Sequence, residues 1–231
     1  MVKNFLILIS LQIFLYSYDQ VILVVSDDLN SSKAKLSCFE GSKQIFETIN
    51  VNIGRSGLAW GIGIIPLQHD MTQPLKYEGD KKAPIGVFRL TKVFGYKTKK
   101  QLKMPYLKAD KELICIDDSN HKRYNQIIKM PFKYENINKP NSFEYMKRDD
   151  HQYELGVVVE HNKNQLKGRG SCIFLHVQKT ENTPTAGCTS MDYSHLNKIV
   201  NWLDISKNPI LIQIPKSEIT QILKLYPQLN K

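Results

Sequence analysis

Short runs of β-branched, aromatic and other apolar residues recur along the chain, and this pattern restricts the possible folds more than any other feature. Eight such runs are bounded by Gly, Pro, Asn or Asp, at residues 21–25, 35–39, 45–54, 86–94, 113–117, 156–161, 172–177 and 209–214. Short β-rich runs between turn-forming residues are typical of strands in a sheet. The pattern therefore predicts a mainly β protein.

Two segments near the C-terminus have the spacing of helices instead. In residues 192–204 four apolar side chains recur at helical intervals, Asp192 or Ser194 can cap the start, and Pro209 follows the end. A second, shorter helix is expected over residues 219–225. The predicted fold class is thus mainly β with a few helices, an α+β arrangement.

A third segment, residues 142–149, has the composition of one or two helical turns. Glu144 and Arg148 are four residues apart in it, and at this spacing opposite charges meet on one face of a helix. We therefore expect a short helix here with a Glu144–Arg148 pair on its surface.

The first residues have the layout of a secretory signal peptide. Lys3 precedes an apolar run over residues 5–15, and the small Ser17 follows it. A buried N-terminal strand or an uncleaved anchor are the alternatives. We expect a signal peptide over residues 1–18 and one domain over residues 19–231. No later segment is apolar for long enough to cross a bilayer, so we expect the mature protein in an extracytoplasmic space.

The chain is strongly basic, with a formal net charge of +10 at pH 7 and a pI of about 9.3. Its lysines are scattered, without a helix-turn-helix, a zinc-finger or an aromatic-basic pattern, which argues against nucleic acid as a partner. Attraction to an anionic polymer of the cell envelope is one interpretation. A solvated lysine-rich surface explains the charge equally well.

The four cysteines, Cys38, Cys115, Cys172 and Cys188, are not arranged as a metal site. None forms a CxxC pair, and no histidine pair completes a zinc-finger spacing. Four cysteines allow three complete disulfide pairings. If Cys188 stays reduced, at most one bridge forms among the other three, and the remaining thiol is expected to be buried as a small apolar group.

The stretch PTAGCTSM, residues 184–191, places Cys188 directly after a glycine and just before the first predicted helix. Twelve residues earlier, His176 ends a largely apolar predicted strand. A loop that folds back would bring the thiol and the imidazole together as a nucleophile and its base. A structural cysteine and a satisfied core histidine are the alternatives.

The order of several motifs resembles the YkuD-type L,D-transpeptidase family of bacterial cell-wall enzymes. Its strand histidine and its [Ser/Thr]-His-Gly-Cys motif correspond to His176 and to Thr185-Ala186-Gly187-Cys188. Residues 77–90 resemble the family's Gly-Asp-x-x-Thr-Pro-x-Gly-x-Phe segment, and residues 114–125 and 168–178 resemble stretches of one exported branch. The resemblance covers residues 21–215. The chain departs from the motif at Ala186, in place of histidine, and at Ser190, in place of an arginine.

This resemblance implies a role for each matching residue. Cys188 is the expected nucleophile and His176 its base, oriented by the backbone carbonyl of Val177. Gly187 allows a close approach of substrate, and the Cys188 amide is expected in an oxyanion hole. The expected substrate-binding residues are Thr185, Ser190, Asp80 and Tyr124; turn formation is the alternative for Thr185 and Asp80. We expect no cofactor and no metal, and an HExxH zinc-hydrolase motif is absent.

The resemblance also implies a reaction on the stem peptides of peptidoglycan. Cys188 attacks the carbonyl that joins the diamino acid of a tetrapeptide stem to its terminal D-alanine, and an amine of a second stem accepts the acyl group. Transfer to water, an L,D-carboxypeptidase reaction, and D-amino-acid exchange are alternatives with the same site. A non-catalytic module that binds the cell envelope is the alternative from another class.

Overall fold

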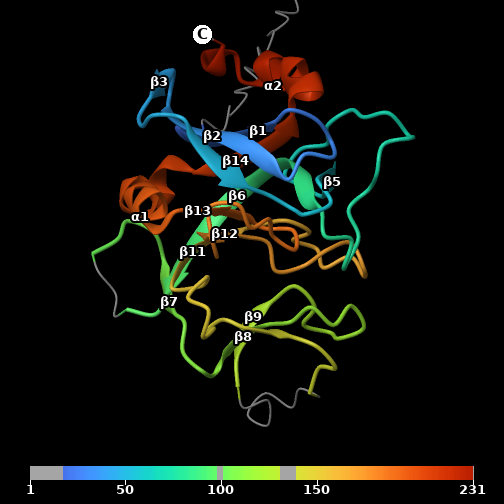
Figure 1. Ribbon diagram of the computed structural model, residues 1–231, viewed down its shortest axis with the longest axis vertical. Coiled ribbons are helices and arrows are strands. Elements are labelled where there is room, and N and C mark those ends of the chain that lie inside the picture. The colour runs from blue at the N-terminus through green and yellow to red at the C-terminus, as the bar shows by residue number, and fades with distance from the viewer. Residues whose placement is uncertain (1–17, 98–100, 131–138, 231) are drawn as a thin grey trace, which may run out of the picture.

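The computed structural model describes residues 18–97, 101–130 and 139–230, and fourteen strands and two α-helices lie in these ranges (Figure 1). The predicted signal peptide lies outside the described residues, apart from Tyr18. The strands are β1 (Gln20–Ser26), β2 (Lys33–Glu40), β3 (Lys43–Gln44), β4 (Ile49–Asn52), β5 (Leu58–Trp60), β6 (Ala83–Gly95), β7 (Tyr106–Lys108), β8 (Leu113–Cys115), β9 (Ile127–Lys129), β10 (Glu144–Tyr145), β11 (Leu155–Val159), β12 (Phe174–Val177), β13 (Thr189–Met191) and β14 (Ile210–Pro215). The helices are α1 (Tyr193–Trp202) and α2 (Ile219–Leu225), and 3₁₀ turns cover Ile205–Lys207, Lys216–Glu218 and Pro227–Leu229.

Eleven strands form one mixed sheet that closes on itself. The strand order is β1-β14-β6-β11-β12-β13-β4-β2-β3, and β1 also pairs with β2, which completes the ring. Most neighbours are antiparallel, whereas β12 and β13 run parallel. Closure leaves few unpaired strand edges. It also places β12, which carries His176, beside the segment that carries Cys188.

Every predicted β region contains a strand, and both predicted C-terminal helices are present, so the mainly β fold class is confirmed. Helix α1 begins as expected, because the Asp192 side chain accepts a hydrogen bond from the Ser194 amide at 2.7 Å. It buries Leu196, Ile199 and Val200 and packs on β11 and β12.

The prediction of a short helix over residues 142–149 is wrong. Glu144 and Tyr145 form strand β10, which pairs with Cys115 and Ile114 of β8. The Glu144–Arg148 pair does not form either, because Arg148 binds Asp150 at 2.6 Å. Pairing with β8, which the local charge spacing does not reveal, determines the conformation of this segment.

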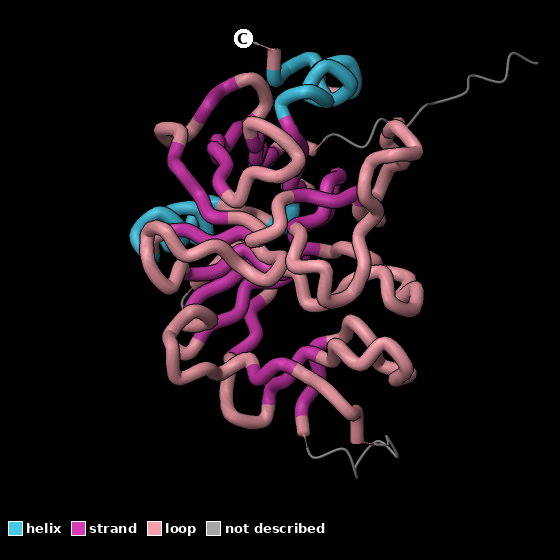
Figure 2. Tube along the Cα trace, turned by 45° about the vertical axis from the view of Figure 1, so that its right-hand side comes forward, coloured by secondary structure: helices cyan, strands magenta, loops and turns pink. Residues whose placement is uncertain are grey.

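A second sheet of three strands, in the order β10-β8-β9, lies below the ring in Figure 1, and the rotated view in Figure 2 shows the same separation. A disulfide between Cys115, at the end of β8, and Cys172, just before β12, joins it to the ring. A small apolar cluster that includes Phe94, Tyr153 and Phe174 fills the space around this bridge.

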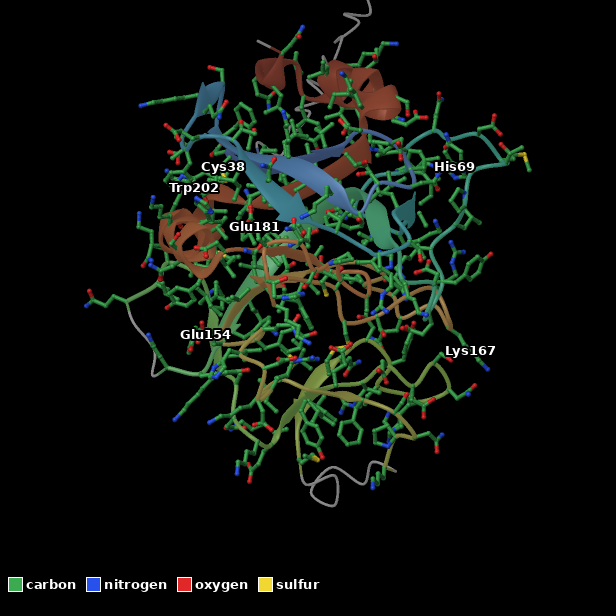
Figure 3. The ribbon with its side chains drawn as sticks, viewed as in Figure 1. Cys38, His69, Glu154, Lys167, Glu181 and Trp202 are labelled. Carbon is green, nitrogen blue, oxygen red and sulfur yellow. A yellow bond between two sulfur atoms is a disulfide. The ribbon has the colours of Figure 1, made fainter. Side chains whose placement is uncertain are left out.

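Cys38 lies elsewhere, in strand β2 of the upper part of the molecule (Figure 3), where it is buried as a free thiol. Burial raises its pKa to about 12. The structure thus has one disulfide bridge, one buried free thiol at Cys38 and a reduced Cys188. This is the arrangement expected from the sequence if Cys188 is the nucleophile.

Neither helix in the described part of the chain has the length and apolar character needed to cross a bilayer.

Candidate active site

A cavity of about 440 Å³ lies where the small sheet meets the ring. Residues 171–173, His176 and residues 183–188 line it from the ring side. Glu144, Arg148 and Tyr153 line it from the segment that includes β10, and residues between Lys76 and Lys81 complete the wall. The structure thus brings Cys188 and His176, which the sequence singled out, into one cavity.

Cys188 is held in the cavity wall at 8% exposure. Its Sγ accepts a hydrogen bond from the Phe174 amide at 3.3 Å, and its S–H points to the Cys172 carbonyl at 3.5 Å. Burial raises the pKa of the thiol to about 12, and the negative charge of Glu144 adds to this effect. Cys188 is therefore a neutral thiol at rest, and it needs a base before it can act as a nucleophile.

His176 lies on β12, and its ring is buried. Its Nδ1 is 2.8 Å from the carbonyl oxygen of Val177. A carbonyl only accepts hydrogen bonds, so Nδ1 carries the proton and Nε2 is left with a free lone pair. The Tyr153 ring packs edge-on against the imidazole at 5.4 Å between centroids.

Burial lowers the pKa of His176 to about 4, with the positive charge of Arg148 as a smaller cause in the same direction. The imidazole is therefore neutral at physiological pH and available as a base. A neutral thiol and a neutral imidazole in one cavity favour proton transfer during the attack on a carbonyl, rather than a thiolate that exists beforehand.

The turn before the nucleophile is fixed by Thr185. Its hydroxyl donates to the Cys188 carbonyl at 2.6 Å and accepts from the Gly187 amide at 3.1 Å. Gly187 has φ +150°, and a Cβ at this position would lie 3.1 Å from the Lys82 carbonyl oxygen. The contacts of Thr185 are those of a turn-forming residue, the alternative noted from the sequence.

The Cys188 amide meets one requirement of an oxyanion hole, because no hydrogen-bond acceptor for it lies among residues 18–97, 101–130 and 139–230. The Gly187 amide, in contrast, is already bonded to Thr185. A donor without a partner beside the nucleophile is suited to stabilising a negatively charged oxygen.

The other expected substrate-binding residues stand behind the lining. Asp80 binds the buried Lys76, with Nζ 2.6 Å from Oδ1, and Lys76 faces the cavity. The Tyr124 hydroxyl donates to Glu78, which faces the cavity too. Ser190 is 1% exposed in β13 and is not part of the lining, so the expected contact with substrate stays a prediction. Its strand position beside His176 in the β12–β13 register explains the burial.

Sequence reasoning missed most of the charged lining. Five basic side chains face the cavity, against two acidic ones: Arg55, Lys76, Lys81, Arg148 and Lys179, and Glu78 and Glu144. They come from distant parts of the chain, and the overall basic charge was the sole signal in the sequence. Such a lining attracts ligands that carry several carboxylates.

In the described part of the chain, no group of three or more His, Cys, Asp or Glu side chains is placed to hold a metal ion.

The fold and the site together define the class of protein. It is a β-sheet domain with a closed mixed sheet, in which a histidine on β12 and a buried cysteine just before β13 line one cavity. A family model for the YkuD L,D-transpeptidase catalytic domain matches residues 20–212. The chain belongs to this family, whose members act on peptidoglycan.

Among solved structures, the chain is similar to the helical cell shape determining protein Pgp2 (K307A mutant) from Campylobacter jejuni. The two share 13% sequence identity with a TM-score of 0.40, over 86% of this chain and 48% of that one. The chain thus spans about half the length of Pgp2. No curated protein sequence matches the chain.

Proposed function

We propose that the protein is an L,D-transpeptidase that cleaves the bond between the diamino acid and the terminal D-alanine of a peptidoglycan tetrapeptide stem. The observation that carries this proposal is the shared cavity of Cys188 and His176 in a chain of this family. The protein would act outside the cytoplasm, where its substrate lies.

In the first half of the reaction, Cys188 Sγ attacks the carbonyl carbon of the diamino acid. The S–H proton passes to Nε2 of His176, and the carbonyl oxygen becomes an oxyanion that the Cys188 amide binds. The C–N bond to D-alanine then breaks, and the departing nitrogen takes the proton from His176. A thioester on Cys188 remains, and the imidazole is neutral again.

In the second half, an amine of another stem attacks the thioester. Its nitrogen loses a proton to His176 as the new C–N bond forms, the C–S bond breaks, and the sulfur takes that proton back. Water in place of the amine gives a tripeptide instead of a cross-link. The acceptor alone therefore separates transpeptidase, exchange and carboxypeptidase reactions.

The basic lining supports this choice of donor. A tetrapeptide stem carries several carboxylates, and Lys76 is held by Asp80 close to the nucleophile, since its Nζ is 3.9 Å from where a Gly187 Cβ would lie. Lys76 is suited to binding a substrate carboxylate in place of the arginine that Ser190 replaces. The net charge of +10 also favours approach to the anionic polymers of the envelope.

The test is mass spectrometry of a purified disaccharide-tetrapeptide after incubation with the protein and with its Cys188→Ala variant. We expect dimers joined through two diamino acids, formed by the protein and not by the variant. Cys38→Ala is the matched control, because it removes the other free thiol and leaves the cavity intact. Tripeptide and D-alanine alone would indicate a carboxypeptidase. If no product depends on Cys188, the site binds the envelope without catalysis or uses other acyl donors.

A further inference from the structure

Glu144 is a carboxyl group in the cavity that the steps above do not use. It lies on β10, and its Oε2 accepts a hydrogen bond from the Tyr153 hydroxyl at 2.6 Å. Neither Oε1 of Glu144 nor any other part of it forms a salt bridge with the described residues. The nearby Arg148 is occupied by Asp150, which it binds through Nε at 2.9 Å and a terminal nitrogen at 2.6 Å. Glu144 thus lines the cavity without a direct salt bridge to a cation of the described residues, and Arg148 acts on it only through its charge.

Glu144 is connected to the catalytic histidine through one side chain. The Tyr153 residue that binds it packs against the His176 ring at 5.4 Å, so one side chain bridges the carboxyl group and the imidazole. The charge of Glu144 acts on Cys188 strongly enough to raise the pKa of the thiol, second only to burial. A ligand group bound to Glu144 would therefore share the cavity with the thioester on Cys188.

The other acidic residue of the lining, Glu78, is placed differently. Its Oε2 accepts hydrogen bonds from the Tyr124 hydroxyl and from Ser171 Oγ, the latter at 2.7 Å. Of the two carboxyl groups, Glu144 is the one whose hydrogen-bond partner, Tyr153, also packs on the His176 ring.

An amine acceptor has a particular need in this cavity. In water at neutral pH an alkyl amine is an ammonium ion, which the five basic side chains of the lining repel. It also has no lone pair until it loses a proton, and His176 accepts only the second proton, which leaves as the C–N bond forms. A carboxylate beside the thioester meets both needs.

We propose that Glu144 is the acceptor site of the enzyme: it binds the ammonium group of the incoming stem and takes one proton from it. This inference rests on the proposed transpeptidase function. The ammonium N–H bond breaks, the proton goes to a Glu144 oxygen, and the neutral amine attacks the thioester. The amide forms, the C–S bond breaks, and the second proton returns to Cys188 through His176. Glu144 then releases its proton to solvent, which balances the cycle.

The surroundings of Glu144 suit this role as a base. Burial raises the pKa of its carboxyl group, and the negative charge of Asp117 acts in the same direction, against the Tyr153 hydrogen bond that lowers it. A carboxylate with a raised pKa takes a proton from an ammonium ion more readily than an ordinary one.

The test measures the ratio of cross-linked dimer to tripeptide formed by the full chain and by its Glu144→Gln variant. The disaccharide-tetrapeptide serves as both donor and acceptor. Gln keeps the size of the side chain and can still accept from Tyr153. In a parallel reaction hydroxylamine, which is largely uncharged at neutral pH, replaces the second stem as nucleophile. Glu181→Gln is the matched control, because it removes the same charge from an exposed residue outside the cavity lining.

We expect the ratio of cross-linked dimer to tripeptide to fall at least about tenfold in Glu144→Gln, because one charge-assisted contact is lost. In Glu181→Gln the ratio should change by less than about twofold. The ratio of hydroxamate to tripeptide should change less than about twofold in either variant. An unchanged dimer ratio in Glu144→Gln, an equal fall with hydroxylamine, or an equal fall in Glu181→Gln would overturn the acceptor site. Tripeptide alone from the unmodified protein would also overturn it, whereas the absence of any Cys188-dependent product would refute the proposed function itself.

Discussion

The Cys115–Cys172 bridge should supply a large share of the stability of this domain. It closes a loop with a sequence separation of 57 residues, and it joins the small sheet to the ring beside the cavity. In the chain-entropy treatment, a loop of this length destabilises the unfolded state by about 4 kcal/mol when it is cross-linked. The double variant Cys115→Ala/Cys172→Ala should lose that contribution.

Urea denaturation followed by tryptophan fluorescence measures the loss. With a denaturant dependence of about 2 kcal/mol per molar, typical of small proteins in urea, the midpoint should fall by about 2 M. A reducing agent should lower the midpoint of the unmodified protein by a similar amount and leave the double variant unchanged. The Cys38→Ala variant keeps the bridge and loses one small buried group, so its midpoint should fall by no more than about 0.5 M. A double variant that melts within about 0.5 M of the unmodified protein would refute the reasoning.

Three further predictions follow from buried groups of the site and its surroundings. His176 and His161 both have a pKa lowered to about 4 by burial, against about 6.5 when unfolded. The unfolded chain therefore binds more protons than the folded protein between these two pH values. The free energy of unfolding should fall as pH drops from about 6.5 to about 4, by up to about 1.4 kcal/mol per pH unit for each histidine. A melting temperature that is constant across this window would contradict the burial of both histidines as neutral rings. In a Cys38→Ala background, the rate of Cys188 alkylation by iodoacetamide should rise about tenfold per pH unit from pH 7 to 9, because burial raises the thiol pKa to about 12; a plateau near pH 7 would show a thiolate at rest. Thr185→Val should lower the free energy of unfolding by about 1–3 kcal/mol through two lost buried hydrogen bonds, whereas Thr185→Ser should keep most of it; equal urea midpoints for the two variants would argue against this turn.

Local patterns were sufficient to predict most of the fold. The strand regions have β-rich composition between turn-forming residues, and α1 has both an apolar stripe and an Asp192 cap, so their signals lie within a few neighbouring residues. Strand β13 escaped prediction because Thr189–Met191 is only three residues long. It is a strand because it lies between β12 and β4 in the closed ring.

The features that sequence reasoning missed depend on distant partners. Residues 142–149 have the charge spacing of a helix, yet Glu144 pairs across to β8, and its side chain binds Tyr153. The partner of Cys172 was left open, because connectivity does not follow from spacing. For the site, the motif indicated that Cys188 and His176 lie together, but it could not show that Ser190 is buried outside the cavity lining.

The central claim is that Cys188 forms a covalent acyl-enzyme with a peptidoglycan stem, and intact-protein mass spectrometry tests it most directly. The protein is mixed with disaccharide-tetrapeptide and quenched in acid within seconds. We predict an added mass equal to the disaccharide-tripeptide acyl group, located on Cys188 by peptide mapping and absent from Cys188→Ala. Release of D-alanine that continues at the same rate in Cys188→Ala, with no adduct on the unmodified protein, would contradict the account.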